Sequence, residues 1–397
     1  MLLGLYWMQR AGTLAVSSRY AQKMYKWAIL PQIVTLVFMQ AIAAQTGSKK
    51  PTFIDVSEPA SPRETQVLCR TIQLGVCGTD RDILDSADPW VPEGESQLIL
   101  GHECLGEVIA VGGSVTGFAP GDFVVPVVRR SIEKQVERID MAPFGAYTER
   151  GIAFEHGFSH PLWLDESCYL FKVPPHLCAL AVFTEPLSVA EKAISEAVAI
   201  QSGRLPKRWL ERPPRVLVTG MGPIGFAAVV AARCRGWEVT MYGRDKPDTF
   251  RAEMVEQFSA SYVSSAKFIS EPADLEEEGF DLILECTGSD DVALKVAPAM
   301  ATCGIMVWLG SVRSPRAKLQ PVETLMRNVL VRNQILLGTV NAALRDFELA
   351  IEHLCQMQAE ESEAVNALIT ARVAPRDALW HYENREPQGI KTVLMYD

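Results

Sequence analysis

The stretch RVLVTGMGPIG, residues 215–225, decides the fold. Its first half, Arg215–Thr219, is an apolar run typical of a buried strand, and a G-x-G-x-x-G pattern follows it at once. Residues 226–235 then have the character of a helix, and residues 238–242 that of a second strand. Glycines between a strand and a helix allow a tight turn and let a pyrophosphate approach the helix N-terminus. The stretch therefore predicts a Rossmann doubly wound parallel sheet that binds a dinucleotide.

The end of the second strand favours NADP over NAD. NAD-binding proteins usually place a carboxylate there, which accepts hydrogen bonds from the ribose hydroxyls. Here the strand ends Tyr242-Gly243-Arg244-Asp245. The Arg244 guanidinium can pair with a 2′-phosphate, and no carboxylate precedes it to repel one. Asp245 comes one place late, so we expect it to cap a turn or face solvent.

Composition and charge narrow the function classes. A chain of 397 residues is long enough for two domains, each with a buried core. The net charge of −10, without a basic stripe, argues against nucleic-acid binding, and nothing suggests a membrane-surface protein. The nine cysteines form no C-x-x-C pair, which is typical of free thiols in a reducing compartment. We therefore expect a cytoplasmic protein.

The first 38 residues are ambiguous. Lys23 and Lys26 precede an apolar run up to residue 38, followed by small residues as at a signal-peptide cleavage site. However, Pro31 interrupts the run, which is also too short for a transmembrane helix. Cleavage after Ala44 would remove the strand predicted at residues 39–43. We interpret residues 1–38 as a dispensable extension, or as the result of an initiation site placed too early, with translation beginning at Met39.

From residue 52 to residue 128, short apolar runs alternate with Pro, Gly and Asp. Examples are the runs at 66–74, 107–111 and 123–128, which predict strands. Many short strands with frequent turns indicate a compact β barrel rather than a parallel sheet. Residues 129–145 are rich in charge and predict a solvated surface loop.

Candidate metal ligands lie between Gly75 and Glu107, in the sequence GVCGTDRDIL…LILGHECLGE. Cys77 offers a thiol, His102 an imidazole and Glu103 a carboxylate. Zinc accepts all three donors, and a catalytic zinc uses about three protein ligands with one position left open. Cys77 lies 25 residues before His102, so the donors meet only if the chain folds back. The same residues could equally be ordinary buried core residues.

A wider pattern resolves this ambiguity by resemblance. Gly101-His102-Glu103-x-x-Gly106-x-Val108 is followed by Val111-Gly112 and by Gly121-Asp122-x-Val124. This series resembles the zinc-dependent medium-chain dehydrogenase/reductase superfamily over roughly residues 39–397. The segments ERGI at 149–152, EPLSV at 185–189 and GTVNA at 338–342 narrow the resemblance to the glucose 1-dehydrogenase branch.

The resemblance implies a domain order and a metal count. It implies a GroES-like β-barrel catalytic domain at 39–188, a Rossmann cofactor domain at 189–341 and a C-terminal return to the catalytic domain at 342–397. Strands at 281–285 and 304–309 fit the Rossmann sheet, while an amphipathic run at 343–354 and a last strand at Lys391–Met395 fit the return. Many relatives carry structural-zinc cysteines that this chain lacks between Cys104 and Cys168. We therefore predict one zinc ion per chain.

The resemblance also assigns roles to residues. Cys77, His102 and Glu103 would bind zinc, and Glu185 would be a further ligand or a substrate contact, unless it merely caps a helix or forms a salt bridge. Thr79, Glu149 and Asn341 would hydrogen-bond sugar hydroxyls; Thr79 could instead stabilise its turn, and Asn341 could be a simple loop residue. The predicted cofactor contacts are Gly220, Gly222, Pro223, Ile224, Gly225, Arg244, Thr287, Gly288, Leu309, Gly310, Ser311, Thr339, Val340 and Asn341.

One departure concerns the proton. Many alcohol-oxidising relatives have a relay histidine five residues after the ligand cysteine, and this chain has Asp82 there. Water, or a carboxylate such as Asp80 or Asp82, would have to serve instead. The remaining histidines carry no motif-level assignment and are interpreted as structural or surface residues: His156, His160, His176, His353 and His381.

The implied reaction is zinc-dependent oxidation of an aldose at C1, D-glucose to gluconolactone, as part of carbohydrate metabolism. One alternative is the same machinery acting on another aldose, a polyol or an alcohol. Another is a protein that binds NADPH without turnover. We expect a sugar as the partner molecule and a homo-oligomer, either a dimer or a tetramer.

Overall fold

The computed structural model describes residues 38–132, 136–265, 279–310 and 322–396. From Phe38 onward the chain forms one compact unit. The predicted extension at 1–38 therefore falls outside the described residues except for Phe38, which begins the first strand. Among the helices described, none combines the length and the apolar character that crossing a bilayer requires.

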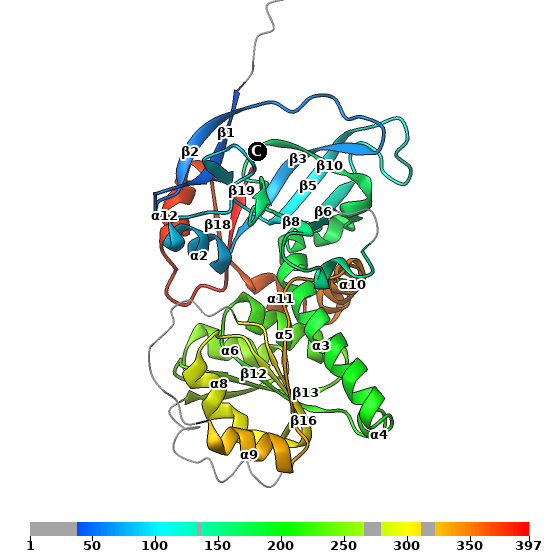
Figure 1. Cartoon of the computed structure of the whole chain (residues 1–397), viewed down its shortest axis with the longest axis vertical. Helices are drawn as coiled ribbons and strands as arrows, with labels where there is room; N and C mark the ends of the chain where they lie inside the picture. Colours follow the sequence, from blue (N-terminus) through cyan, green and yellow to red (C-terminus); the bar gives the residue numbers. More distant parts are fainter. Residues whose placement is uncertain (1–37, 133–135, 266–278, 311–321, 397) are drawn as a thin grey trace, which may run out of the picture. The chain divides into compact units, whose positions relative to one another are not determined.

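Most of the N-terminal half of the chain and two strands near its C-terminus fold into three sheets (Figure 1). We call these three sheets and the segments that connect their strands the mixed-sheet region. In the first sheet, β1 (Phe38–Gln45) pairs with β2 (Thr52–Ser57) and β4 (Gln97–Ile99). The largest sheet has the order β11-β6-β5-β3-β19-β18, with β10 also on β3. Its strands are β3 (Gln66–Val76), β5 (Glu103–Val111), β6 (Phe123–Pro126), β10 (Leu162–Glu166), β11 (Leu170–Lys172), β18 (Ile369–Val373) and β19 (Lys391–Met395).

Strand β3 organises this region. Its first eight residues alternate between half-buried and buried, as in a strand with one face on the core. It pairs with β5 so that Gly75 lies opposite Glu103. The last strand of the chain, β19, also pairs with β3 and places Thr392 opposite Val76. The C-terminus therefore returns to this sheet and brings Lys391 beside the start of β5.

A second region is built on a six-stranded parallel sheet with the order β14-β13-β12-β15-β16-β17. Its strands are β12 (Arg215–Thr219), β13 (Glu238–Gly243), β14 (Ser261–Ser264), β15 (Phe280–Glu285), β16 (Met300–Trp308) and β17 (Ile335–Gly338). We call this the parallel-sheet region. The chain runs from β12 outward on one side and returns to β15 on the other, so a crevice is expected at the carboxyl ends of these two strands.

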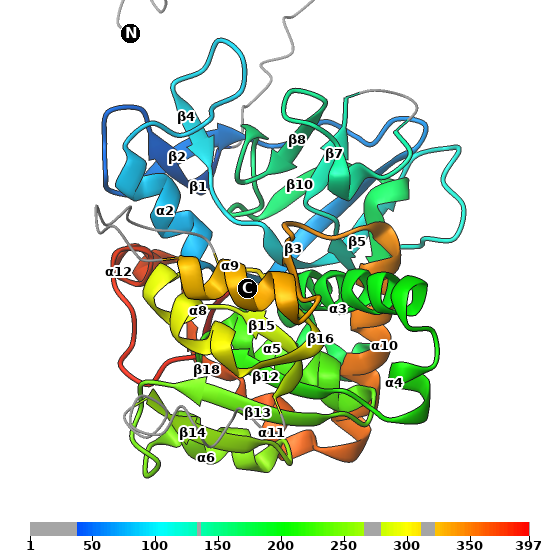
Figure 2. The ribbon, with the colours of Figure 1, turned by 60° about the horizontal axis from the view of Figure 1, so that its bottom comes forward.

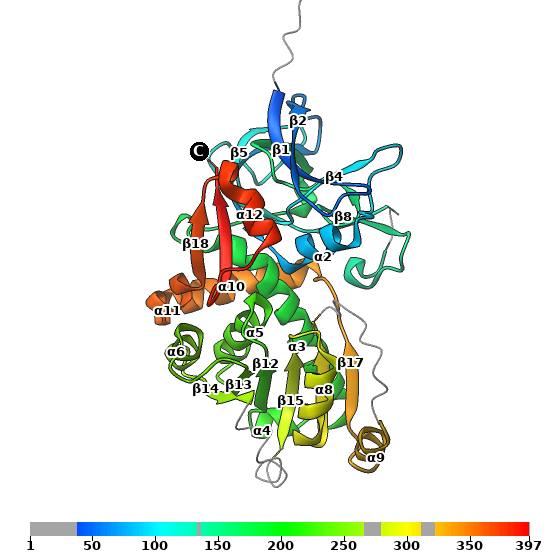
Figure 3. The ribbon, with the colours of Figure 1, turned by 90° about the vertical axis from the view of Figure 1, so that its left-hand side faces the viewer.

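Helices cover both faces of the parallel sheet (Figure 2, Figure 3). Val216 and Val218 of β12 face a core that includes α3 (Thr184–Arg204), α5 (Pro223–Cys234), α6 (Phe250–Gln257) and α10 (Leu344–Glu360). Leu217, between them, faces the opposite core, which includes α8 (Asp290–Val296) and Leu325 of α9 (Glu323–Val331). A strand buried on both faces reads as continuously apolar, which is why this sheet was predictable.

The segment 129–145 differs from its prediction as a solvated loop. It contains β7 (Arg129–Ser131), which pairs with β8 (Tyr147–Arg150), and a 3₁₀ turn at Ile139–Met141. Arg129, Arg130 and Asp140 are buried. Each has a partner of opposite charge, which is how charged residues are accommodated in protein interiors. The prediction of a solvated loop was wrong for these residues, because their charge is paired internally.

The domain boundaries remain a prediction. Residue 188 lies inside α3, a continuous helix of 21 residues, and the described residues from Phe38 onward form one unit. The α/β class, with a GroES-like β region and a Rossmann sheet, is confirmed. Helix α5 begins at Pro223, three residues before the predicted start, since proline suits the first helical position.

Candidate active site

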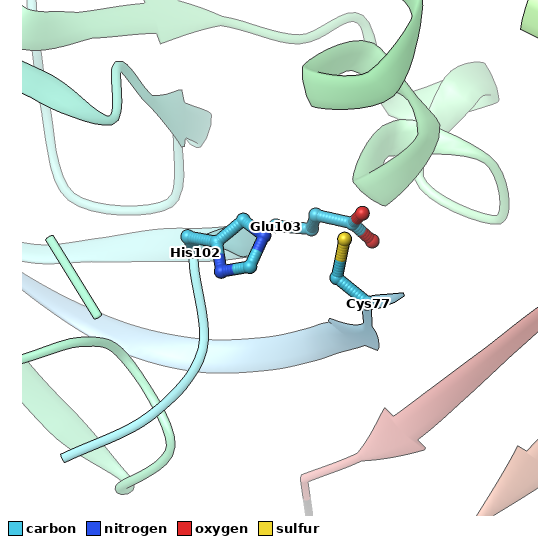
Figure 4. Close-up of side chains that lie close together, drawn as sticks. All are labelled: Cys77, His102 and Glu103. Carbon is cyan, nitrogen blue, oxygen red and sulfur yellow. The ribbon is translucent and has the colours of Figure 1, made fainter. Parts of the chain in front are cut away.

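Cys77, His102 and Glu103 converge at one point of the mixed-sheet region (Figure 4). One donor atom from each lies within 4.8 Å of the other two. Cys77 follows β3 directly, and Glu103 is the first residue of β5, which pairs with β3. Gly101 permits the turn into His102 with a φ of +94°, a conformation that L side chains rarely adopt. The fold-back required of the sequence is therefore the β3–β5 pairing.

The donor set fits zinc. Thiolate, imidazole and carboxylate are its usual protein ligands, at about 2.0–2.3 Å from the ion. Donor atoms within 4.8 Å of one another are close to the separation that one shared ion requires. Local sequence makes room for the carboxylate, because a Cβ at Gly75 would lie 2.1 Å from Glu103 Oε2. Any residue other than glycine at this position would displace Glu103.

Lys391 fixes the orientation of Glu103. Its ammonium group donates to Glu103 Oε2 and lies 3.4 Å from the carbonyl oxygen of Val76. Both side chains of the ion pair are almost fully buried. Burial by itself would lower the pKa of Lys391, but Glu103 and Cys77 raise it above its usual value. Lys391 is thus the positively charged partner of Glu103, and nothing in the sequence indicated this pair.

Asp80 orients His102. One Asp80 carboxylate oxygen lies 3.5 Å from His102 Nδ1, and the other accepts the backbone N–H of Cys77 at 2.8 Å. This leaves His102 Nε2 for an ion, as in the carboxylate–histidine–metal arrangements of metalloproteins. Burial would lower the pKa of His102, but Asp80 and Cys77 raise it well above its ordinary value. Burial also raises the pKa of Asp80, against the opposing effect of His102.

The metal-ligand cluster opens into a cavity of about 930 Å³. The cavity walls include the three donors and every sugar contact implied by the resemblance. Of the two carboxylates that could carry a proton to solvent, Asp82 lines the cavity, while Asp80 is fully buried against His102. Asp82 is therefore the better placed of the two.

Glu149 and Asn341 form a hydrogen-bonded pair in the cavity wall. Asn341 Nδ2 donates to Glu149 Oε1 at 2.7 Å, and Arg129 Nε donates to the same oxygen at 2.9 Å. Asn341 has a φ of +61°, which asparagine tolerates better than most residues. The pair comes from segments 192 residues apart. Its formation explains why two distant motifs belong to one site.

Thr79 and Glu185 lie in the same cavity wall. Thr79 Oγ1 is 3.7 Å from Cys77 Sγ. Glu185, in the first turn of α3, is crowded by protein yet partly exposed to the cavity, and it lies outside the cluster of three donors. Burial raises the pKa of Glu185 to about 7; His102 opposes this shift and Glu103 adds to it.

Lys192 of α3 connects the segments that contain Val340 and Asp140. Its buried ammonium group donates to the carbonyl oxygen of Val340 at 2.8 Å and to that of Asp140 at 3.2 Å, and it pairs with Asp140 Oδ2 at 3.0 Å. Val340 immediately precedes Asn341. Lys192 lies three residues after the EPLSV segment at 185–189, and nothing in the sequence indicated its partners.

The glycine turn after β12 lies in the same cavity as the metal-ligand cluster. The cavity is lined by these predicted cofactor residues: Gly220, Gly222, Pro223, Ile224, Arg244, Thr287, Leu309, Gly310, Val340 and Asn341. Three others, Gly225, Gly288 and Thr339, do not line it, and Ser311 lies outside the described residues. Gly225 instead packs the turn, because a Cβ there would lie 1.9 Å from the carbonyl oxygen of Gly220.

Several cavity residues were missed by sequence reasoning. They are Met221, Tyr242, Asp245, Arg251, Cys286 and Ser289 from the parallel-sheet region, Trp90, Ile152 and Val189 from earlier in the chain, and Arg385, Glu386 and Gly389 from the C-terminal segment. Those next to the glycine turn could have been found by extending the motif. Those from residues 385–389 gave no sequence signal, because only folding brings them to the cavity.

Comparison with known proteins agrees with this geometry. A model of the alcohol dehydrogenase GroES-like domain matches residues 63–174, and a model of the glucose dehydrogenase C-terminus matches residues 178–396. The first match is typical of the alcohol-dehydrogenase class of oxidoreductases, and the second narrows this class to the glucose dehydrogenases.

Relatives of the chain include the glucose 1-dehydrogenase of Thermoproteus tenax, which is 37% identical over 341 residues, covering 86% of this chain and 94% of that protein. Glucose 1-dehydrogenase 2 of Vulcanisaeta moutnovskia is also 37% identical, covering 80% and 88%. Haloferax mediterranei glucose dehydrogenase, solved in complex with NADP, Zn and gluconolactone, has a TM-score of 0.79 and 29% identity, covering 90% and 99%. The chain belongs to the glucose 1-dehydrogenase family of medium-chain dehydrogenases.

Proposed function

We propose that this protein oxidises D-glucose at C1 to gluconolactone, with NADP as the hydride acceptor and one zinc ion per chain. The observation that carries the proposal is that the Cys77–His102–Glu103 cluster and the glycine turn after β12 line one cavity. The solved relative from Haloferax mediterranei, in complex with NADP, Zn and gluconolactone, supports the choice of ligands.

Cys77, His102 and Glu103 would hold the zinc, with Glu185 as a fourth ligand or a substrate contact. When bound, zinc supplies Lewis acidity and the nicotinamide accepts a hydride, so the reaction releases NADPH and one proton. Asp80 and Lys391 keep His102 and Glu103 in the orientation that binding needs. Asp82, at the cavity wall, is the carboxylate we assign to passing the proton towards solvent.

Thr79, Glu149 and Asn341 would hydrogen-bond the sugar hydroxyls. Glu149 Oε1 already accepts from Asn341 and Arg129, so its position is set before substrate arrives. A site built on such polar partners rejects analogues that lack a hydroxyl more strongly than an apolar pocket does. We therefore expect deoxy sugars to be poor substrates.

The glycine turn would cradle the pyrophosphate, and Arg244 would contact the 2′-phosphate of NADP. Residues of the 287–288, 309–311 and 339–341 segments would complete the nucleotide site. Arg244 is exposed at the end of β13 and lines the cavity, as this role needs.

We also propose a cytoplasmic homo-oligomer, a dimer or a tetramer. All nine cysteines are free in the described structure, which suits a reducing compartment. Exposed apolar side chains gather on α9, at Met326, Leu330 and Val331, and such patches commonly mark subunit contacts. Sedimentation analysis of the purified protein would give the subunit number directly.

The test is a substrate and cofactor panel run with a zinc assay. Purified protein is offered D-glucose, D-galactose, D-xylose, 2-deoxy-D-glucose, sorbitol and simple alcohols, each with NADP or NAD. We expect the highest kcat/KM for D-glucose with NADP, and one zinc per chain. A preference for a polyol or an alcohol would favour the same machinery with another substrate. Tight NADPH binding without zinc-dependent turnover on any compound would favour a non-catalytic protein.

A further inference from the structure

The nucleotide end of the cavity contains a carboxylate that ought to oppose NADP. Asp245 lines the cavity directly after Arg244, one place beyond the position at which NAD-binding proteins usually have their acidic residue. A free carboxylate at this point would repel a 2′-phosphate and would accept hydrogen bonds from an unphosphorylated ribose. By charge alone, Arg244 favours the binding of a 2′-phosphate and Asp245 opposes it.

The structure shows how this carboxylate is occupied. Arg251, in the first turn of α6, donates from Nε to Asp245 Oδ2 and from Nη2 to Asp245 Oδ1, both at 2.8 Å. Gln388 Nε2 adds a third donor, 3.1 Å from Oδ2. The Asp245 side chain is only 12% exposed and that of Arg251 23%. Both carboxylate oxygens thus face protein donors within the cavity wall.

Further contacts fix the same arrangement. The Tyr262 hydroxyl donates to the backbone carbonyl of Asp245 at 2.6 Å, which holds the peptide in place. The backbone N–H of Arg251 lies 3.4 Å from Gln388 Oε1, so Gln388 contacts both members of the ion pair. A two-pronged guanidinium–carboxylate pair has a defined geometry that a lysine could not reproduce.

We propose that Arg251 is a positioning residue that determines cofactor specificity. By engaging both oxygens of Asp245 it cancels the negative charge and turns the carboxylate from the ribose, so that Arg244 alone meets the 2′-phosphate. This inference rests on the proposed use of NADP. The specificity device is then a triad, Arg244–Asp245–Arg251, of which only the first two members adjoin in sequence.

The competing explanation is that the ion pair only fastens α6 to the preceding loop. The chain offers a matched control for that case. Arg212 donates from Nη2 to both carboxylate oxygens of Asp281 at 2.9 Å, in the same region, and neither residue lines the cavity. Removing Arg212 should affect stability without affecting the choice of cofactor.

The experiment measures equilibrium binding of NADPH and NADH, by fluorescence titration, to the full-length protein and four variants. The variants are Arg251→Met, Asp245→Asn, Arg251→Met with Asp245→Asn, and Arg212→Met. We expect Arg251→Met to reduce the NADPH/NADH affinity ratio at least tenfold. The reduction should be larger at low ionic strength than at high ionic strength, because salt screens the repulsion between Asp245 and the 2′-phosphate. In the double variant the ratio should return to within about threefold of the wild type, because the repelling carboxylate is gone.

Three results would overturn the proposal. The first is an unchanged ratio in Arg251→Met, and the second is an equal loss in the double variant, as a purely structural role predicts. The third is a wild-type protein that binds NADH as tightly as NADPH. If the wild type prefers NADPH and the double variant rescues, yet no sugar is oxidised, the proposed dehydrogenase activity fails and the specificity device stands.

Discussion

The mixed-sheet region and the parallel-sheet region are stabilised in different ways. Among the described residues, the mixed-sheet region buries ten Asp, Glu, His, Lys or Arg side chains: Asp80, His102, Glu103, Arg129, Arg130, Asp140, Glu149, Arg150, Asp165 and Lys391. Among such residues, the strands of the parallel sheet bury only Asp281 and Glu285, and the helices α3 and α10 packed on it bury Glu191, Lys192, Asp346 and His353. The first region is held by specific pairs of charges, and the second by apolar packing on both faces of a sheet.

This difference separates chemistry from cofactor binding. A buried charge that loses its partner is strongly destabilising, so paired groups hold one geometry around the metal site. Apolar packing tolerates substitutions that keep the volume of the side chain but not those that add volume. The glycine turn should therefore be sensitive to any added side chain rather than to loss of charge. Substitutions in the two regions should therefore affect different observables.

The largest effect should come from the metal ligands. Cys77→Ser and His102→Ala should each lower kcat by at least about 10³-fold, because a metal Lewis acid contributes several kcal/mol to the transition state. NADPH affinity, which depends on the parallel-sheet region, should stay within about twofold. Steady-state kinetics and fluorescence titration measure the two quantities. Cys168→Ser, an exposed thiol in the same region, is the control. Near-normal kcat in either ligand variant would break the comparison.

Next in size is the loss of Lys391. Lys391→Met leaves Glu103 buried without its positive partner, so we expect zinc affinity to fall about 10–100-fold and unfolding free energy to fall by about 3–5 kcal/mol. Competition with a chelator and denaturant titration measure these. The control is Lys172→Met, whose half-exposed ion pair with Asp122 should contribute about 1 kcal/mol or less. Equal effects from the two lysines would mean that burial of charge is not what distinguishes this region.

In the parallel-sheet region, Gly225→Ala should weaken cofactor binding and leave the metal site unchanged. The new Cβ would lie 1.9 Å from the carbonyl oxygen of Gly220 and force the turn open. We expect NADPH to bind about tenfold more weakly and the unfolding free energy to fall by about 1–3 kcal/mol through overpacking, while the zinc content stays unchanged. Gly203→Ala, where a Cβ meets nothing within 4 Å, is the matched control. Loss of zinc in the Gly225 variant would contradict independent behaviour of the two regions.

The smallest effect concerns acid. Burial lowers the pKa of His160 to about 4, with Arg150 adding to the shift. In the unfolded chain His160 takes up a proton near pH 6.5, and in the folded chain it does not. The contribution of neutral His160 to the free energy of unfolding is therefore fully present above pH 6.5. It is lost as pH falls towards 4, by a few kcal/mol at most. Denaturant titrations at several pH values across this range give the unfolding free energy as a function of pH. We expect this free energy to fall less steeply with acid in His160→Gln than in the wild type, and as steeply as in the wild type in the variant of an exposed histidine, His176→Gln. Equal slopes in wild type and His160→Gln would contradict this assignment.

The same contrast explains how much of the molecule could be predicted from sequence. Strands Arg215–Thr219 and Lys391–Met395 were predicted at their observed bounds, because continuous apolar runs identify buried strands. The cluster of Cys77, His102 and Glu103 was predicted from motif resemblance. Its supporting partners were not. Lys391 lies 288 residues from Glu103, and no local pattern connects them.

The other omissions have the same physical cause. Charge in residues 129–145 indicated solvent exposure, since sequence cannot show that Arg129 and Asp140 find buried partners. Asp245 was expected to cap a turn or face solvent, since its pairing with Arg251 depends on how α6 packs. Pairing of charges is a property of the folded chain, while apolar periodicity is a property of the sequence.

The central claim is tested most directly by removing and restoring the metal. Protein stripped with a chelator is titrated with zinc while D-glucose-dependent reduction of NADP is followed. We predict no measurable rate without metal and a linear recovery that ends at one zinc per chain. Full activity in metal-free protein, or a recovery that ends only at two zinc ions per chain, would contradict it.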